Sequence, residues 1–200
     1  MTYEDLQMID KDNAAEAAKR ISPQEIAQLV GWLSESEDGI RYPSLLILQS
    51  RSAIADDVYA YRETFREKLS SDNSFQRNIG LIMTAANARW DDGWLDGVIA
   101  EYLDCLNDDK PITVRMCVQH LKSIVPYKPG LCVAMALDLN AVRETMRKLV
   151  LIDILEVLAM IRAAKTNDAI ESYIMDAMAG GLLDRKSKKH IEQLLAAEAT

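Results

Sequence analysis

"LNDDKPITVRMCVQHLKSIVPYKP", residues 106–129, joins a short polar segment to a run of regularly spaced apolar residues. The polar part mixes acids, an amide, a lysine and a proline, and the rest repeats apolar side chains every three or four positions. That spacing places the apolar side chains on one face of an α-helix. The apolar positions are Val114, Cys117, Val118, Leu121, Ile124 and Val125.

The segment upstream has the same periodicity and predicts a second helix. Between the two helices, Asn107 to Lys110 forms a polar break. Pro111 suits a first helical turn, where its missing N–H costs nothing. Acidic groups near that helix start favour the positive end of the helix dipole. We therefore predict a tight turn between two antiparallel helices. The apolar positions of the upstream helix are Leu95, Val98, Ile99, Tyr102, Leu103 and Leu106.

The same unit recurs along the chain: a turn with acids, then an arginine, then an apolar helix. It appears as "SEDGIRYPSLLIL", "SDNSFQRNIGLIM", "NDDKPITVRMCVQHL" and, more loosely, "RETMRKLVLIDIL". Its arginines are 36, 38 and 32 residues apart. A period near 35 residues with two helices per period is typical of an α-solenoid. The arginines are Arg41, Arg77, Arg115 and Arg147.

The register also suggests partners for two of these arginines. Asp72 precedes Arg77 by five residues, and Asp109 precedes Arg115 by six. We predict that Arg77 and Arg115 contact these turn acids and so stabilise the turns.

The remaining segments fit the same organisation. The chain has only 8 Gly and 5 Pro, too few for a β-rich fold with frequent turns. Further apolar faces comprise Ile26, Leu29, Val30 and Leu33, then Val58, Tyr61, Phe65 and Leu69. A last helix pair is expected at Asp168 to Ala179 and Asp184 to Ala197, with Gly180-Gly181 as the helix stop. The alternative to a repeat array is a non-repetitive helical bundle.

This aspartate–turn–arginine register resembles HEAT repeats and their armadillo-like relatives, in which such arginines often pair with turn acids. More narrowly, the chain resembles a family of small bacterial HEAT-like proteins of about this length. The matching segments cover the middle of the chain; both ends match less clearly. They are "ARWD" (Ala88 to Asp91), "DDKPITVR" (Asp108 to Arg115), "YKP" (Tyr127 to Pro129) and "MRKLVLIDI" (Met146 to Ile154).

We therefore predict an all-α fold: a right-handed α-α superhelix (a HEAT/ARM-like solenoid) of about five antiparallel helix pairs. The whole chain, 1–200, is expected to form a single domain. Residues 1–20 are predicted to be an N-terminal capping segment, and 182–200 to contain a C-terminal capping helix. Leu103, Val118, Ile79 and Leu149 are expected to lie in one continuous core.

Some members of the resembling family carry the name SufBD protein, which implies a role in iron–sulfur cluster assembly. The assembly scaffold of that name is a β-helix, whereas this chain is predicted to be helical throughout. No group of cysteines here has the spacing that holds a cluster. We expect no such role and no cofactor.

The net charge of −8 argues against a protein whose main task is to grip nucleic acid. Near the C-terminus a basic cluster indicates either a solvated first turn of the last helix or a local nucleic-acid patch. The cluster comprises Arg185, Lys186, Lys188, Lys189 and His190.

Several features bear on the compartment. The acidic N-terminus lacks the pattern of a secretion signal. The most apolar run, Leu149 to Ile161, is interrupted by Asp153 and Glu156 and is shorter than the roughly 20 residues of a membrane span. We expect it to be a buried helix. The three cysteines have no CxxC spacing, which favours free thiols in a reducing cytoplasm. They are Cys105, Cys117 and Cys132.

The sequence contains no phosphate loop, dinucleotide fingerprint, zinc-protease motif or nucleophile elbow. His120 sits beside an apolar stripe and is expected to be a boundary residue rather than a ligand. Asp153 interrupts an apolar helix, and its two interpretations are an ion pair with a basic residue or a perturbed catalytic acid. We predict no catalytic, cofactor-binding or metal-binding residues.

"ARWDDGWLDG", Ala88 to Gly97, is the candidate partner-binding segment. Aromatic residues in a loop rimmed by charge suit a protein-binding hot spot. The candidate residues are Trp94, Trp90, Asp91 and Asp92. We expect Trp94 to be the more exposed tryptophan. The alternative is that a tryptophan packs between successive repeats.

The favoured function is a non-enzymatic interaction or scaffold module for an unidentified protein or peptide, because stacked helix pairs present an extended surface. The alternative, by resemblance, is a HEAT-like DNA glycosylase, for which Trp90, Asp91 and Arg115 supply the residue types. The sequence does not indicate the oligomeric state.

Overall fold

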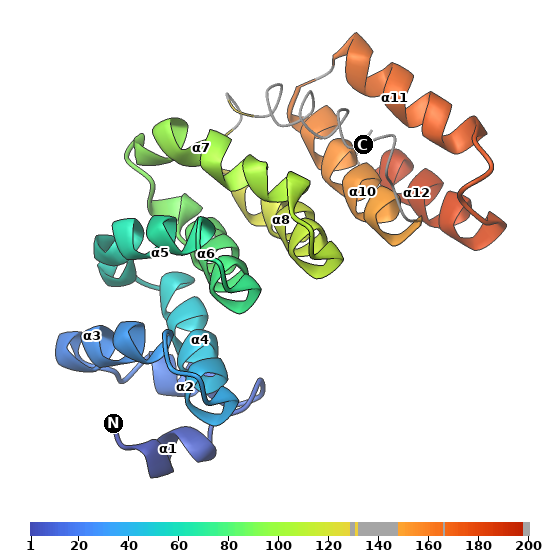
Figure 1. Ribbon diagram of the computed structural model, residues 1–200. Helices are drawn as coiled ribbons and strands as arrows, with labels where there is room; N and C mark the ends of the chain where they lie inside the picture. Colours follow the sequence, from blue (N-terminus) through green and yellow to red (C-terminus); the bar gives the residue numbers. More distant parts are fainter. Residues whose placement is uncertain (129–130, 132–147, 166, 198–200) are drawn as a thin grey trace. The chain divides into compact units, whose positions relative to one another are not determined.

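The computed structural model describes residues 1–128, 131, 148–165 and 167–197, and all regular structure within them is helical (Figure 1). This confirms the predicted all-α class. The α-helices are α1 (Tyr3–Gln7), α2 (Ala14–Ala18), α3 (Pro23–Trp32), α4 (Asp38–Ser52), α5 (Arg62–Leu69), α6 (Ser74–Ala86), α7 (Trp94–Asp104), α8 (Pro111–Ile124), α10 (Lys148–Ala164), α11 (Asp168–Ala179) and α12 (Arg185–Ala197). Short 3₁₀ helices are η1 (Asp57–Tyr61), η2 (Ala88–Trp90) and η3 (Cys105–Asn107). The predicted features at Cys132, Met146 and Arg147 lie outside the described residues.

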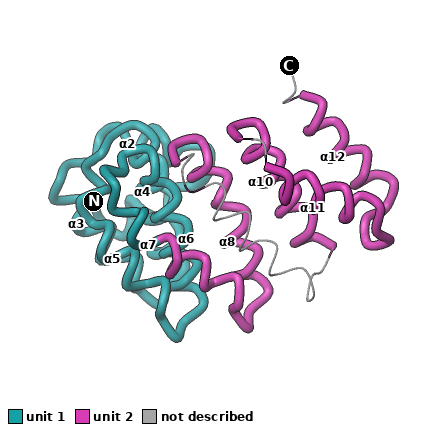
Figure 2. Tube along the Cα trace, turned by 90° about the horizontal axis from the view of Figure 1, so that it is seen from above, with its two compact units in different colours: residues 1–98 teal, residues 99–200 magenta. Residues whose placement is uncertain are grey.

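The chain divides into two compact units, and the boundary falls within α7 (Figure 2). Unit 1 is Met1–Val98 and unit 2 is Ile99–Thr200. The sequence had suggested one domain over 1–200, and each unit is described below by itself.

In unit 1, α3 packs on α4 and α5 packs on α6, while α1 and α2 also contact α4 (Figure 1). The helix starts follow from local sequence. Ser22 precedes Pro23, and its hydroxyl accepts a hydrogen bond from the Glu25 N–H at 3.3 Å. In return the Glu25 carboxylate accepts from the Ser22 N–H at 2.8 Å. This capping box satisfies backbone donors that α3 would otherwise leave unpaired.

Gly80 lets α5 and α6 approach closely. A Cβ atom at this position would lie 2.9 Å from the Phe65 carbonyl oxygen and 3.0 Å from the Leu69 nitrogen. Both obstacles are backbone atoms, which cannot move aside as a side chain can. Phe65 is fully buried beneath this contact, as the apolar periodicity predicted.

The predicted apolar faces of unit 1 form its core. All four predicted residues of α3 and its end are buried, as are Val58, Phe65 and Leu69, whereas Tyr61 is partly buried. The buried core cluster comprises Leu6, Ala18, Ile21, Ile26, Leu29, Val30, Leu33, Leu45, Ile47, Leu48, Val58, Phe65, Ile79 and Met83.

In unit 2, α8 packs on α10, and α10 also packs on α11 and α12. Pro111 is at the start of α8, as predicted. The fully buried Tyr102 donates a hydrogen bond from its hydroxyl to the Cys117 carbonyl at 3.1 Å. The bond satisfies the one polar group of this large side chain inside the core.

Leu149 was predicted to lie in the core, but its side chain is 55% exposed. The prediction was wrong because the run 149–155 is apolar on nearly every side, so periodicity could not choose its buried face. The buried face of α10 instead comprises Val150, Leu151, Asp153, Ile154, Leu155, Val157, Leu158, Ala159 and Ile161. Among the helices described, none is long and apolar enough to cross a membrane.

Polar side chains join helices at a recurring sequence separation. In unit 1 the Lys68 amine donates to the Ser34 hydroxyl at 2.9 Å, across 34 residues. In unit 2 Glu156 bonds residues 34 positions away on both sides, Lys122 and His190. These separations lie close to the period that the arginine register predicts.

Candidate interaction surface

Trp90 is tied to the end of α4 inside unit 1. Its indole Nε1 donates to the carbonyl of the buried Ser52 at 2.6 Å. The Arg89 guanidinium lies over the Trp90 ring, 4.9 Å from its centre, and also donates to the Ala53 carbonyl. Trp90 and Arg89 therefore join the turn before α7 to the C-terminal end of α4.

Asp91 and Asp92 share one partner, the hydroxyl of Tyr59. The hydroxyl oxygen is 3.0 Å from Asp91 Oδ1 and 2.9 Å from Asp92 Oδ1. Burial and these two carboxylates raise the pKa of Tyr59. The phenol therefore stays protonated and acts as a hydrogen-bond donor to the carboxylates. Asp91 also accepts hydrogen bonds from the backbone N–H groups of Gly93 and Leu95 at 3.0 and 2.8 Å.

Gly93 makes this turn possible. Its φ is +112°, a conformation that side-chain-bearing residues rarely adopt. The turn then leads directly into α7, whose first residue is Trp94.

Trp94 packs within unit 1 as well. Its Nε1 donates to Glu63 Oε1 at 2.5 Å, and its ring meets the Tyr59 ring edge to face at 6.4 Å. Both Trp90 and Trp94 are half-buried, and both indole N–H groups have partners. Both tryptophans therefore pack against preceding elements of unit 1, which favours the packing alternative over an exposed binding anchor.

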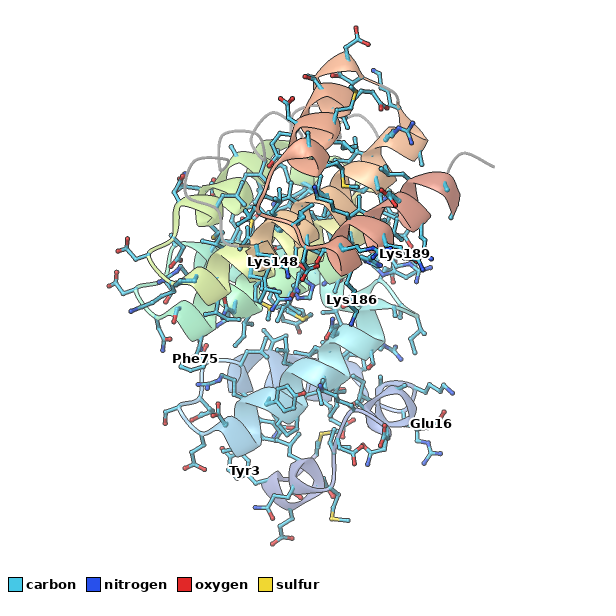
Figure 3. The ribbon with its side chains drawn as sticks, turned by 90° about the vertical axis from the view of Figure 1, so that its right-hand side faces the viewer. Tyr3, Glu16, Phe75, Lys148, Lys186 and Lys189 are labelled. Atoms are coloured by element: carbon cyan, nitrogen blue, oxygen red, sulfur yellow. The ribbon has the colours of Figure 1, made fainter. Side chains whose placement is uncertain are left out.

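A groove of about 520 Å³ opens between α4 and α6, where sequence reasoning had placed no site. Two large side chains on its lining are exposed to solvent: Tyr42 is 45% exposed and Phe75 is 58% exposed (Phe75 is labelled in Figure 3). The lining comprises Asp38, Gly39, Arg41, Tyr42, Pro43, Leu45, Phe75, Asn78, Ile79 and Ile82. The available signal was an aromatic residue within two positions of the repeat arginine in two successive repeats.

Arg41 lies against this groove and is largely buried. Its guanidinium donates to the carbonyls of Glu35 and Ser36 at 3.0 and 3.4 Å and pairs with Asp38. The same guanidinium lies 4.9 Å from the centre of the Phe75 ring. Arg41 therefore closes the turn before α4 and supports the exposed aromatic residue on α6.

Arg77 has a related role. Its Nη1 donates to the Ser71 carbonyl at 2.6 Å, whereas the predicted partner Asp72 forms no ion pair among the described residues, so that pairing was wrong. In both Arg41 and Arg77 the guanidinium bonds a carbonyl six residues earlier. The repeat arginines of unit 1 thus hold the backbone of the turn before their helix.

Arg115 differs, and its predicted pairing with Asp109 was wrong. Its Nε donates to Asp153 Oδ2 at 2.7 Å, across from α8 to α10. Gln119 donates to the other oxygen of Asp153 at 3.2 Å. The Asp153 side chain is only 6% exposed. Asp153 is therefore the ion-paired acid of the first interpretation, and Arg115 neutralises it.

Glu156, on the same face of α10, bonds two neighbouring helices. It pairs with Lys122 of α8, and its other oxygen lies 2.7 Å from His190 Nε2 of α12. Burial alone would raise the pKa of Glu156, but the hydrogen bonds from Lys122 and His190 outweigh it and lower the pKa below its ordinary value. Glu156 thus joins α8, α10 and α12 through polar contacts.

The basic cluster occupies the start of α12, as predicted. A hollow there is lined by Leu183, Arg185, Lys188, Lys189 and Glu192 (Lys186 and Lys189 are labelled in Figure 3). Within the described residues, none of the four Lys and Arg side chains of the cluster makes an ion pair. They form a solvated positive surface beside the paired Lys148 and Asp184.

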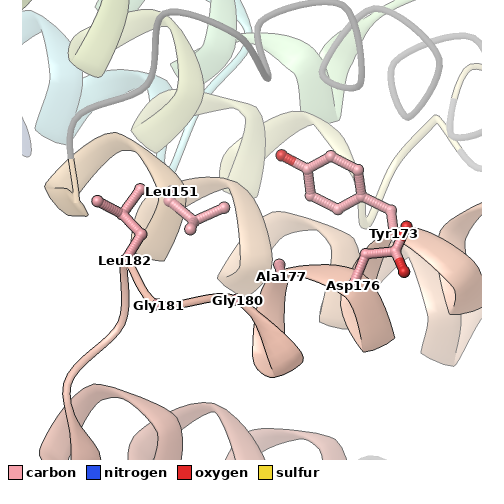
Figure 4. Close-up of a pocket in the computed structure, with 7 residues that line it drawn as sticks. All are labelled: Leu151, Tyr173, Asp176, Ala177, Gly180, Gly181 and Leu182. Atoms are coloured by element: carbon pink, nitrogen blue, oxygen red, sulfur yellow. The ribbon is translucent and has the colours of Figure 1, made fainter.

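A small pocket in unit 2 follows the predicted helix stop (Figure 4). Its volume is about 200 Å³, which is below the range of most small-molecule sites. Tyr173 and Asp176 of α11 are its only side chains with polar groups, beside Leu151, Ala177, Leu182 and the Gly180–Gly181 backbone.

The described residues bring together no group of three His, Cys, Asp or Glu side chains that could hold a metal ion. Burial lowers the pKa of His120 and raises that of the Cys117 thiol. The buried Cys117 thiol stays protonated and is a poor metal ligand and nucleophile, because the thiolate is the reactive form.

No family model matches the chain, and no curated protein and no solved structure matches it either.

Proposed function

We propose that this chain is a non-enzymatic interaction module that binds a protein or peptide through the groove between α4 and α6. The observation that carries the proposal is the pair of exposed aromatic side chains, Tyr42 and Phe75, on the lining of one apolar groove. Large aromatic side chains at a concave apolar surface are the typical anchors of binding hot spots.

The groove is supported by well-packed neighbours. Leu45 and Ile79 are buried members of the unit 1 core, and Pro43 is buried within α4. The guanidinium of Arg41 packs against the ring of Phe75 and helps to hold it in place. A rigid groove loses little conformational entropy when a partner binds, which favours affinity.

The proposal includes a HEAT-like solenoid of about five helix pairs as its architecture. The bonds at separations of 34 residues in both units support a repeating arrangement. In repeat proteins, grooves between neighbouring helices commonly serve as partner surfaces.

The alternative of a HEAT-like DNA glycosylase has less support. Of the residues that the glycosylase alternative would use, Arg115 forms an ion pair with the buried Asp153. Asp91 accepts hydrogen bonds from Tyr59 and from the α7 backbone. The lining of the unit 1 groove is mainly apolar and aromatic, and its one cation, Arg41, is paired with Asp38 rather than free to bind a phosphate.

The test is affinity capture from native cells followed by mass spectrometry, with three baits. These are the wild-type chain, the double variant Tyr42→Ala/Phe75→Ala, and Met175→Ala as the control, because Met175 is an exposed apolar residue in unit 2. We expect a partner that wild type and Met175→Ala retain and the double variant loses. Equal recovery on all three baits would contradict the proposed surface.

A further inference from the structure

We propose that the groove binds a positively charged segment of a partner protein, with a large apolar side chain seated between Tyr42 and Phe75. This inference rests on the proposed function and specifies the partner's chemistry. It depends on three features of the groove: acceptors that lack donors, an arginine that is already occupied, and a rim of carboxylates.

The first acceptor is the side-chain oxygen of Asn78. Asn78 lines the groove, and its Oδ1 atom is buried without a hydrogen-bond partner among the described residues. Leaving such an atom unpaired is unfavourable by roughly 1–3 kcal/mol. A ligand N–H recovers that energy if the Asn78 side chain turns its oxygen toward the groove.

The second acceptor is a backbone carbonyl. Pro43 lies inside α4 and has no N–H to donate to the carbonyl of Gly39, four residues earlier. Both Gly39 and Pro43 line the groove. The Gly39 carbonyl therefore receives no helix hydrogen bond from residue 43.

Arg41 cannot offer its charge to an anionic ligand. Its guanidinium already bonds two carbonyls and Asp38 and lies over Phe75. The cation on the groove lining is thus neutralised within unit 1, which disfavours phosphate or carboxylate ligands.

The surroundings of the groove are negative. Glu35, Glu37 and Asp38 lie in or next to the first turn of α4, and Asp72 lies just before α6; all four are exposed. Among the described residues, Glu35, Glu37 and Asp72 form no ion pair. Unit 1 as a whole carries 17 Asp and Glu against 10 Lys and Arg. A cationic partner is attracted to this field, and an acidic one is repelled.

The apolar part of the lining sets the second requirement. Tyr42, Phe75 and the partly buried Ile82 leave apolar surface facing solvent in the groove. A volume of about 520 Å³ holds a few side chains rather than a folded domain. The occupant that satisfies both requirements is a short segment that combines Lys or Arg with one large apolar residue.

The experiment is a selection from a random dodecapeptide phage library on the immobilised full chain. Each clone is counter-screened on Tyr42→Ala/Phe75→Ala. We expect the groove-dependent clones to carry a net positive charge and at least one Leu, Met, Ile, Phe or Trp. Groove-dependent clones that are acidic or uncharged would overturn the charge inference and leave the proposed function standing. No clone that distinguishes wild type from the double variant would overturn both.

A synthetic peptide from the selection then tests the rim by fluorescence anisotropy. The rim variant Glu37→Gln/Asp72→Asn is expected to weaken binding about fivefold at low salt. The control Glu4→Gln/Asp12→Asn removes the same charge from exposed acids elsewhere in unit 1 and is expected to change binding less than twofold. If both variants weaken binding equally, the effect comes from the net charge of unit 1. That result would overturn the inference that Glu37 and Asp72 act at the groove.

Discussion

The guanidinium of Arg41 lies 4.9 Å from the centre of the Phe75 ring, so an arginine of one predicted repeat supports the exposed aromatic residue of the next. Arg41 also bonds the turn before its own helix. One side chain therefore couples the local backbone of a turn to the surface on which we place partner binding.

Arg115→Ala is expected to lower the free energy of unfolding by about 1–3 kcal/mol, because it leaves Asp153 buried beside Gln119 alone. Urea denaturation of the variant measures the loss. Lys19→Ala is the matched control, since it removes an ion pair whose side chains are both exposed, and its effect should stay within about 0.5 kcal/mol. An unchanged midpoint for Arg115→Ala would contradict the assignment of Arg115 as the partner on which the burial of Asp153 depends.

Gly80→Ala and Gly97→Ala should change stability in opposite directions. Both glycines lie inside helices, where alanine is intrinsically better by up to about 1 kcal/mol. At Gly97 nothing lies within 4 Å of an added Cβ, so a gain is expected. At Gly80 the Cβ would collide with the α5 backbone, and a loss of about 1–3 kcal/mol is expected. Thermal melts of the two variants decide the point, and a stabilised Gly80→Ala would show that the α5–α6 approach relaxes easily.

Glu25 should make the stability of unit 1 depend on pH. The backbone hydrogen bond from Ser22 contributes most to lowering its pKa from 4.5 to about 2, followed by the Met1 amine and the Ser22 hydroxyl. Because the folded pKa is the lower one, the carboxylate stabilises the fold fully above pH 4.5, and this contribution is lost as the pH falls toward 2.

The variant Glu25→Gln isolates this effect, because glutamine keeps the capping-box geometry and removes the charge. We expect wild type to be more stable by roughly 1 kcal/mol at pH 7. Denaturation of both proteins at several pH values should show the difference shrinking below pH 4.5. A difference that stays constant down to pH 2.5 would contradict the lowered pKa of Glu25.

Trp94→Ala is expected to destabilise unit 1 by about 1–3 kcal/mol, since it removes the bond to Glu63 and the contact with Tyr59. Trp94→Phe keeps an aromatic ring against Tyr59 and should lose less. A partner-binding anchor would behave in the opposite way, with an unchanged melting temperature and weaker capture. Melts of the two variants together with capture assays separate the two roles.

Much of the fold could be predicted from helix periodicity, because a helix that buries one face has apolar residues at regular spacing along the sequence. The faces that begin at Ile26 and at Leu95 are buried as predicted, and α11 spans Asp168–Ala179 as predicted. The pattern failed at Leu149, where apolar residues surround the helix and local spacing carries no information about the neighbour.

Partners across helices were harder to predict. Asp109 is near Arg115 in sequence, but Asp153 meets Arg115 only because α8 and α10 pack together. Likewise, Trp94 was expected to be the more exposed tryptophan because it precedes the apolar face that begins at Leu95, whereas its partners Tyr59 and Glu63 come from the preceding helix pair. The groove escaped notice because Tyr42 and Phe75 are 33 residues apart and their exposure depends on tertiary packing.

The position of the unit boundary has a practical consequence for the spectroscopy of this chain. The three tryptophans, Trp32, Trp90 and Trp94, all belong to unit 1, and the cysteines all belong to unit 2. Indole fluorescence therefore follows the opening of unit 1. In a Cys132→Ser background, labelling of the buried thiols Cys105 and Cys117 follows the opening of unit 2. Denaturation monitored by both signals can thus reveal whether the two units unfold in one cooperative step or in sequence.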